Sequence, residues 1–312
     1  MIDLKKIQRG RVQLPPRVLF YGFDGVGKTT AACGAPDALA LDFNRGSVKF
    51  DVARVAPGSF SEMNEWLTAI EKGDVRCSSV VVDSLTEAEM LSHADLFAGS
   101  SIEDFNGGFG RGQTHAVMKW RDVLAQLDRI WLQGKAIALI AHSTVKKFDD
   151  PTGPGYERFE PSLQPKLAGL VRQWVDFVLF CREEVVISKS KTEKTKGVTT
   201  GIRYAYTRRC PAFDAKARGT SLFPERILLG WQPLMDAIAA DEARSGEMRA
   251  EIDLMLAEVG DVALTKKVTE WLRANPSNVV ETHNRVKEIL ETKKSAEVPA
   301  MDAKAAQASS VS

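Results

Sequence analysis

The chain has few cysteines, no long apolar run and almost no net charge. Its four cysteines lie far apart and form no C-x-x-C pair, which disfavours a zinc site and a disulfide framework. No stretch approaches the roughly 18 apolar residues that a membrane-spanning helix needs, and the N-terminus MIDLKKIQRG lacks an apolar signal core. We therefore expect a cytoplasmic protein with no membrane partner. The formal net charge of +1 indicates no global basic field, so any nucleic-acid surface must be local.

A glycine-rich segment after a short apolar run is the most informative motif. Residues 22–30 read GFDGVGKTT, a match to G-x-x-x-x-G-K-T, and residues 17–21 before it suit a buried strand. Glycines let successive backbone N–H groups point at one phosphate, and the start of a helix presents its positive end to the same anion. The segment therefore predicts a phosphate-binding loop.

The loop predicts ATP and Mg²⁺ as ligands. Lys28 would neutralise the β- and γ-phosphates, and the hydroxyl of Thr29 would hold the metal. The residues expected to contact the nucleotide are Gly22, Asp24, Gly25, Val26, Gly27, Lys28, Thr29 and Thr30.

Apolar runs alternate with helical stretches, which predicts an α/β fold with a mainly parallel sheet flanked by helices. The expected core strands are 18–21, 38–42, 79–83, 136–142 and 174–181. Shorter β-like pieces at 185–188, 202–207 and 227–229 predict a hairpin extension, and its lysine-rich tip lies within 189–201.

The pattern becomes helical and charged after residue 234. We expect a P-loop domain over 1–234, a small helical module over 235–293 and a disordered tail over 294–312, where Ala and Ser dominate without an apolar period.

A carboxylate and an imidazole follow two of the expected strands. Asp83 ends the run 79–83 and is placed to support Mg²⁺ as a Walker B residue, although it also suits a helix N-cap. In nucleotide kinases and small GTPases the Walker B strand lies beside the loop strand, whereas in the RecA-like class another strand separates them. His142 would end that intervening strand, either as a sensor of the γ-phosphate or as a satisfied strand-end residue.

Over residues 15–233 the chain resembles RecA-like ATPases of phages, including Sak-type single-strand annealing or recombination proteins. The resemblance is carried by GFDGVGKTT, LALDFNRG at 39–46, VVVDS at 80–84, LIAHS at 139–143 and the segment 146–167 that leads to VDFVLF. It implies a RecA-like P-loop core, Mg²⁺-dependent ATP hydrolysis, assembly into a ring or filament, and single-stranded DNA as a partner. The location would be the host cytoplasm. From their amphipathic pattern alone, the C-terminal helices would mediate assembly or recruit a partner such as a single-strand binding protein or annealase.

The segment FDAKARG at 213–219 is similar to a lysine-x-arginine element that some RecA-like ATPases insert into the neighbouring subunit's site. The resemblance implies that Lys216 and Arg218 reach a neighbour's γ-phosphate, where added positive charge stabilises the transition state. A solvated basic loop is the other interpretation.

One position departs from the family pattern. A Glu that orients the attacking water usually follows the second strand, but Asn44 stands there. Asp42, Glu62, Glu65 and Glu87 remain candidates for that role.

Two regions mix basic and aromatic residues where RecA-like proteins bind DNA. They are the glycine-rich segment 105–112 and the segment 146–159, both expected to be flexible. The candidate contacts are Phe109, Arg111, Lys146, Lys147 and Arg158.

Two other functions stay open at this point. One is a nucleotide-dependent accessory protein that organises a replication or recombination complex without binding DNA. The other is a small-molecule kinase, which the inferred intervening strand disfavours.

Overall fold

The computed structural model describes residues 13–97, 101–105, 108, 110–151, 153–189, 195–219 and 222–308. The chain forms two compact units. Unit 1 comprises the chain through Ala217 together with Glu225–Leu234, and unit 2 comprises Arg218–Pro224 and the chain from Met235.

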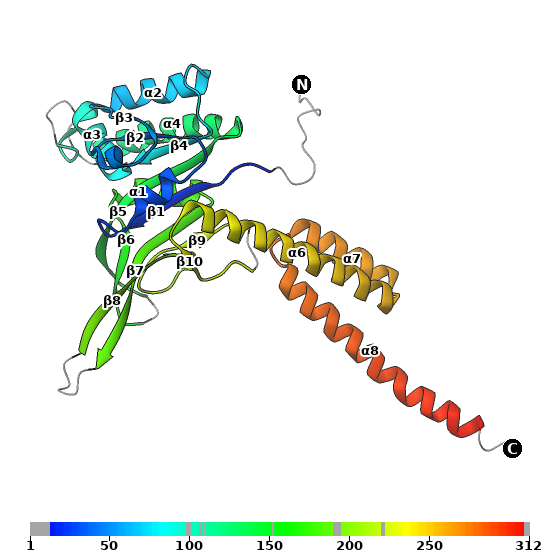
Figure 1. The fold of residues 1–312 in the computed structure, drawn as a ribbon. Coiled ribbons are helices and arrows are strands. Elements are labelled where there is room, and N and C mark those ends of the chain that lie inside the picture. The colour runs from blue at the N-terminus through cyan, green and yellow to red at the C-terminus, as the bar shows by residue number, and fades with distance from the viewer. Residues whose placement is uncertain are drawn as a thin grey trace. The chain divides into compact units, whose positions relative to one another are not determined.

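Unit 1 is built on a mixed sheet with the strand order β10-β8-β7-β1-β5-β4-β2-β3 (Figure 1). The pairs among β1, β2, β3, β4, β5 and β7 are parallel, whereas β8 and β10 add to the edge in antiparallel fashion. This arrangement confirms the predicted parallel sheet with a hairpin extension. The strands are β1 Arg17–Gly22, β2 Ala38–Asp42, β3 Ala53–Val55, β4 Ser79–Asp83, β5 Ala136–Phe148, β7 Phe177–Lys189, β8 Thr195–Tyr206 and β10 Arg226–Leu228.

β5 lies between β1 and β4, as the sequence predicts for the RecA-like class. Its register sets His142 opposite Gly22 of β1 and Leu139 opposite Val82 of β4. All three strands are parallel, so their carboxyl ends meet at one edge of the sheet, where ligands bind in open α/β folds. This strand order separates the chain from nucleotide kinases.

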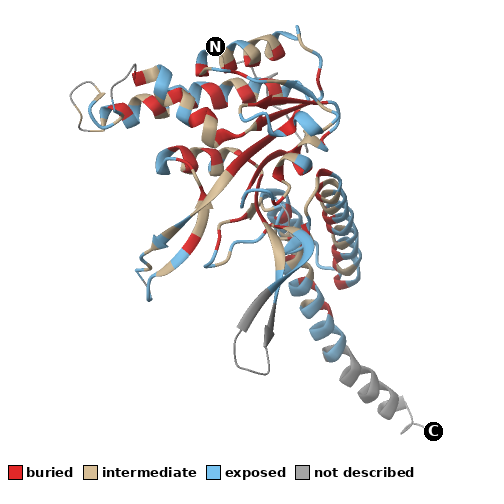
Figure 2. Ribbon diagram, turned by 60° about the vertical axis from the view of Figure 1, so that its left-hand side comes forward, coloured by how far each residue is buried: buried red, intermediate tan, exposed pale blue. Residues whose placement is uncertain are grey.

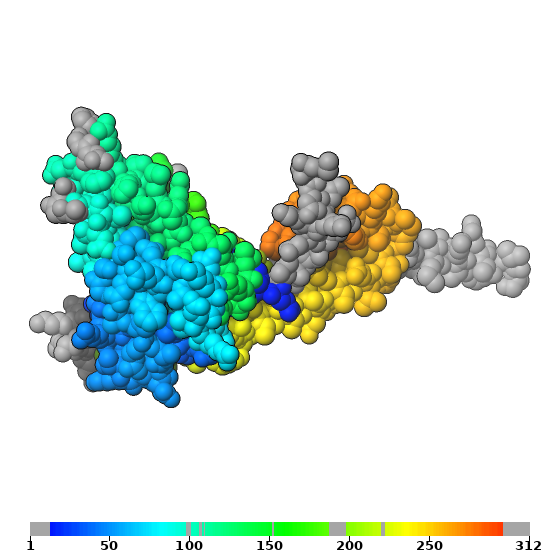
Figure 3. Space-filling view, turned by 90° about the horizontal axis from the view of Figure 1, so that it is seen from above, coloured from blue at the N-terminus to red at the C-terminus, as the bar shows by residue number. Residues whose placement is uncertain are grey.

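Both faces of the sheet are covered. One face packs on α2 (Phe60–Lys72), α4 (Arg111–Leu132) and α5 (Pro165–Trp174) in a core that contains Leu67, Trp120, Leu127 and Val171. Because strand side chains alternate, Val18 and Phe20 face the other side, and they are fully buried. The core strands are accordingly red in Figure 2, and Figure 3 shows the light-blue segment that includes α2 at the surface of unit 1.

Two expected strand ends differ in the structure. β5 does not stop at His142 but continues to Phe148 and pairs antiparallel with β6 (Tyr156–Pro161). The segment 146–159, expected to be a flexible loop, is therefore mainly a hairpin, because turn-forming residues around 151–155 join two runs that can extend. The fifth strand begins at Phe177 instead of Trp174, which ends α5. Residues 190–194 of the lysine-rich tip lie outside the described part.

Unit 2 contains the rest of α6 (Trp231–Val259), α7 (Val262–Ala274) and α8 (Val279–Ala308). Its core joins Ile252, Leu256, Leu272, Val279 and Val286. α8 is helical through Ala308, within the segment for which the sequence predicts a tail without structure. In the described part of the chain, no helix has the length and apolar character needed to cross a bilayer.

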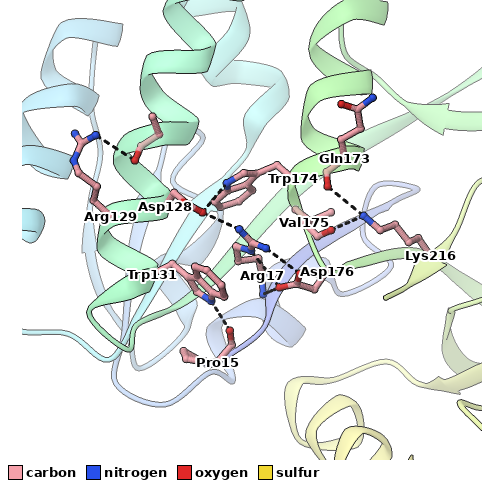
Figure 4. A network of polar contacts seen from close by, with 11 residues as sticks. Pro15, Arg17, Asp128, Arg129, Trp131, Gln173, Trp174, Val175, Asp176 and Lys216 are labelled. Carbon is pink, nitrogen blue, oxygen red and sulfur yellow. Dashed lines mark hydrogen bonds and ion pairs between the residues drawn. The ribbon is translucent and has the colours of Figure 1, made fainter. Parts of the chain in front are cut away.

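The start of β1 is fixed by a buried arginine. The guanidinium of Arg17 lies 2.8 Å from Asp128 and 3.0 Å from Asp176, and it stacks 4.0 Å from the ring centroid of Trp131 (Figure 4). The side chain of Trp174 donates to Asp128 at 3.2 Å and flanks the same cation. This network joins β1, α4 and the junction of α5 with β7.

We expect Arg17→Met to lower the free energy of unfolding of unit 1 by about 3 kcal/mol, because it leaves two partly buried carboxylates without their buried cation. Chemical denaturation followed by tryptophan fluorescence measures this change. The control is Arg208→Ala, which breaks the exposed pair with Glu225 and should cost at most about 1 kcal/mol. Equal losses in the two variants would contradict a stabilising network.

A second buried group ties α3 (Leu85–Phe97) to the start of α5. Glu89 is 7% exposed, and its carboxylate accepts the backbone N–H of Gln164 at 3.0 Å. Burial raises the pKa of Glu89 from 4.5 to about 7, against the opposing effects of the Gln164 hydrogen bond and of Lys146. The folded protein therefore binds this proton more tightly than the unfolded chain does.

It follows that stability should fall as the pH rises from about 5 to 8, since the folded state loses a proton that the unfolded state has already released. We expect Glu89→Gln to remove roughly 2–3 kcal/mol of this decline, as judged from denaturation at both pH values. The exposed Glu65→Gln on α2 is the control. A Glu89→Gln protein with the wild-type decline would rule out Glu89 as its source.

Candidate functional site

The phosphate-binding loop leaves the end of β1 through positions that only glycine satisfies. A Cβ at Gly22 would lie 2.2 Å from the carbonyl oxygen of Cys181 on the neighbouring β7. Gly25 and Gly27 have φ values of 73° and 103°, in the left-handed region that other residues rarely adopt. The loop then enters α1 (Lys28–Cys33).

Lys28 is held against the loop backbone. Lys28 is 6% exposed, and its Nζ donates to the carbonyls of Gly22 at 2.8 Å and Phe23 at 2.7 Å. Burial lowers the pKa of Lys28, and the carboxylates of Asp24, Asp83 and Glu87 partly oppose this effect. The ammonium of Lys28 thus lies against the loop that the sequence predicts to bind phosphate.

Thr29 and Asp83 meet across the sheet edge. The Thr29 hydroxyl donates to Oδ2 of Asp83 at 2.6 Å. Burial raises the pKa of Asp83, while the hydrogen bond from Thr29 and the charge of Lys28 act in the opposite direction. Hydroxyl and carboxylate oxygens are the ligands that Mg²⁺ takes when substrate phosphates complete its shell, so this pair fits the predicted metal. No cluster of three or more His, Cys, Asp or Glu residues among the described ones offers another metal site.

His142 bridges the loop and α3. Its Nδ1 lies 2.5 Å from Oδ1 of Asp24, and its Nε2 lies 3.2 Å from Oε1 of Glu87. Its backbone N–H donates to the hydroxyl of Thr86 at 3.2 Å. The imidazole therefore lies beside the loop, where the sequence places a sensor, and contacts two carboxylates.

The structure distinguishes among the carboxylates considered for water activation. Asp42 accepts the backbone N–H groups of Gly46 at 2.9 Å and Ser47 at 2.8 Å, so it holds the turn after β2. Glu62 accepts the N–H of Gly58 at the start of α2. Glu65 is exposed on the same helix.

Among these carboxylates, Glu87 is linked to the loop. It contacts His142, which in turn contacts Asp24 of the loop. Burial alone would raise the pKa of Glu87, but hydrogen bonds from Ser84 and Asn44 and the nearby His142 outweigh burial and lower it. Asn44, which stands where the family pattern has Glu, thus supports a carboxylate from another element. Sequence reasoning missed the contacts of Ser84 and Thr86, although both residues lie within three positions of Asp83.

Lys216 has partners within its own chain. It lies in β9 (Lys216–Ala217), and its Nζ donates to the carbonyls of Arg172 at 2.7 Å and Val175 at 2.6 Å, at the end of α5. Figure 4 shows the contacts of Lys216 with Val175 and with Gln173, whose carbonyl lies 3.4 Å away. Capping a helix end is a structural role, which differs from the predicted reach into a neighbour. Arg218 is exposed and belongs to unit 2, and its role stays a prediction.

The nucleic-acid candidates fall into two groups. Arg111 at the start of α4 is exposed, and the side chains of Lys147 and Lys146 are 77% and 39% exposed on the β5–β6 hairpin. Arg158 is only 4% exposed and lies 5.3 Å from the ring centroid of Phe148. Arg158 is therefore buried and is not presented to a ligand at the surface. Phe109 lies outside the described residues.

No curated protein sequence matches the chain. Among solved structures, the crystal structure of the RadB recombinase is similar over 70% of this chain and 90% of that chain, with 14% sequence identity and a TM-score of 0.39. The profile of a family described as an AAA domain matches residues 14–219, more than half of the 312-residue chain. With a phosphate-binding loop on β1 and β5 inserted before β4, the chain belongs to this AAA domain family and has the RecA-like form of its fold.

Proposed function

We propose that the protein is a Mg²⁺-dependent ATPase of phage-type DNA recombination or repair, which acts on or with single-stranded DNA as an oligomer. The observation that carries the proposal is the chain of contacts from Thr29 to Asp83 and from Asp24 through His142 to Glu87 around one loop. Membership of the AAA domain family supports nucleotide binding. The phage-type role rests on the order of the sequence motifs.

The residues have distinct tasks in this proposal. The loop amides and Lys28 bind the phosphates, and Thr29 and Asp83 hold Mg²⁺, which would neutralise phosphate charge there. Glu87 orients the attacking water and accepts its proton. Its lowered pKa keeps the carboxylate ionised and able to hold the water by a hydrogen bond, while it makes Glu87 a weaker base. His142 links the position of Glu87 to that of the loop.

The site is also connected to a candidate DNA surface. His142 lies within β5, and the same strand carries Lys146 and Lys147 further along. Phe23 of the loop packs on Phe159 of β6 with ring centroids 5.1 Å apart. A change at the loop can therefore reach the hairpin through a strand and an aromatic contact.

The oligomeric part of the proposal assigns Arg218 to a neighbouring subunit's site, since a guanidinium supplied from outside the loop accelerates phosphoryl transfer strongly. The C-terminal helices would recruit a single-strand binding protein or annealase. A groove of about 610 Å³ between α7 and α8, lined by apolar residues such as Trp271 and by charged ones such as Lys267 and Glu281, is a surface in unit 2 that suits such a partner.

We expect Glu87→Gln to lower the ATP hydrolysis rate about 100-fold, because it removes the base while it keeps the side chain's shape. Phosphate release under saturating ATP and Mg²⁺ measures the rate. Nucleotide affinity should stay within about threefold of wild type. Glu62→Gln, which alters a carboxylate at the start of α2, is the matched control, and an equal loss in both variants would refute the assignment.

We expect replacement of Lys146 and Lys147 by alanine to weaken single-stranded DNA binding and to reduce the slope of log K against log salt by about 1.4, because each lysine–phosphate contact contributes about 0.7. Anisotropy titrations at several salt concentrations with an ATP analogue measure the slope.

The control for this experiment is Lys72→Ala, which removes one exposed lysine on α2. Absence of any salt-dependent DNA binding by the wild type would favour the accessory function, in which nucleotide binding organises a complex without direct DNA contact.

A further inference from the structure

An arginine from the sheet extension lies against the phosphate-binding loop. Arg203 of β8 pairs directly with Glu183 of β7. On the other edge of β7, Cys181 lies opposite Gly22, the last residue of β1. The β7–β8 hairpin therefore continues past the end of β1, next to the loop, and carries Arg203 there.

The guanidinium approaches the loop closely at Gly27. A Cβ on Gly27 would lie 3.2 Å from Nη1 of Arg203 and 3.8 Å from its Cδ. The carbonyl of Arg203 accepts the backbone N–H of Leu229 at 2.9 Å, and the side chain of Leu229 lies 3.7 Å from the same Cβ position. β10 and its following residue thus fix the backbone from which Arg203 reaches the loop.

The ion pair that orients Arg203 leaves it in contact with solvent. Nε lies 3.3 Å from Oε1 of Glu183, and the two side chains are 47% and 36% exposed. An exposed pair of this kind contributes little to stability. Its position beside a phosphate-binding loop is therefore not explained by folding alone.

We propose that Arg203 is a second cation of the nucleotide site, supplied by the same chain, and that it binds the α- and β-phosphates. The inference rests on the proposed nucleotide-binding function. Loop amides of this motif surround the α- and β-phosphates, whereas Lys28 reaches the β- and γ-phosphates. The fork of a guanidinium matches two phosphate oxygens, and Gly27 is the loop residue that it covers.

The test is the affinity of the full chain for mant-ATP and mant-ADP, measured by fluorescence titration. Arg203→Ala should weaken both ligands by the same factor, about 10-fold to 100-fold, because it removes charge-assisted hydrogen bonds to phosphates that both ligands contain. Arg208→Ala, an exposed arginine paired with Glu225, is the control and should bind both like wild type. Melting temperatures verify that the variants fold.

Further variants separate the possible failures. If Lys28→Ala keeps wild-type affinity, the loop is not a nucleotide site, and the proposed function falls together with this inference. If Lys28→Ala loses binding while Arg203→Ala does not, this inference alone is overturned. A loss confined to mant-ATP would overturn the assignment to the α- and β-phosphates. The affinity of Glu183→Gln for both nucleotides should stay within about threefold of wild type. A loss of affinity as large as that of Arg203→Ala would show that the ion pair of Arg203 with Glu183 has only a structural role, and would overturn this inference.

Discussion

The insertion of β5 between β1 and β4 is the constraint on which the candidate site depends. It sets His142 opposite Gly22 and so brings an imidazole beside the phosphate-binding loop. It also moves Asp83 one strand away from the loop, at a distance that the Thr29 hydroxyl spans with a 2.6 Å hydrogen bond. If the two strands were adjacent, no backbone position would exist for the residue that links Asp24 to Glu87.

Charge balance explains why the site needs more than one cation. Asp24, Asp83 and Glu87 surround the loop, and Lys28 is the buried ammonium among them. A polyphosphate adds further negative charge, so its binding requires compensation beyond Lys28. Mg²⁺ held at Thr29 and Asp83 would provide part of this compensation. Arg203, which lies beside Gly27 on the β7–β8 hairpin, would provide another part.

The sequence predicts the loop, Asp83 and His142 because each belongs to a local pattern, whereas the strand between β1 and β4 is predicted from the class of phosphate-loop protein. β2 and β4 match their expected bounds, since turn residues flank both apolar runs. The polar hairpin formed by residues 143–161 was not predicted, because its strands are stabilised by pairing with each other and not by an apolar period. The sequence offers Glu87 only as one of four candidate carboxylates and does not indicate Arg203, since the positions of both depend on contacts between elements that are far apart in the chain, as with the 3.2 Å approach of Glu87 to His142.

β1 carries stability at one end and the candidate chemistry at the other. Arg17 fixes its start through Asp128 and Asp176, and Gly22 ends it against Cys181. The strand between them is fully buried and parallel to neighbours on both sides, so it has little freedom to shift. In the proposed function, movement linked to the nucleotide would therefore pass through the loop itself and through His142. His142 lies in β5, and this strand leads to the hairpin with β6, where the lysines are exposed and Arg158 is buried.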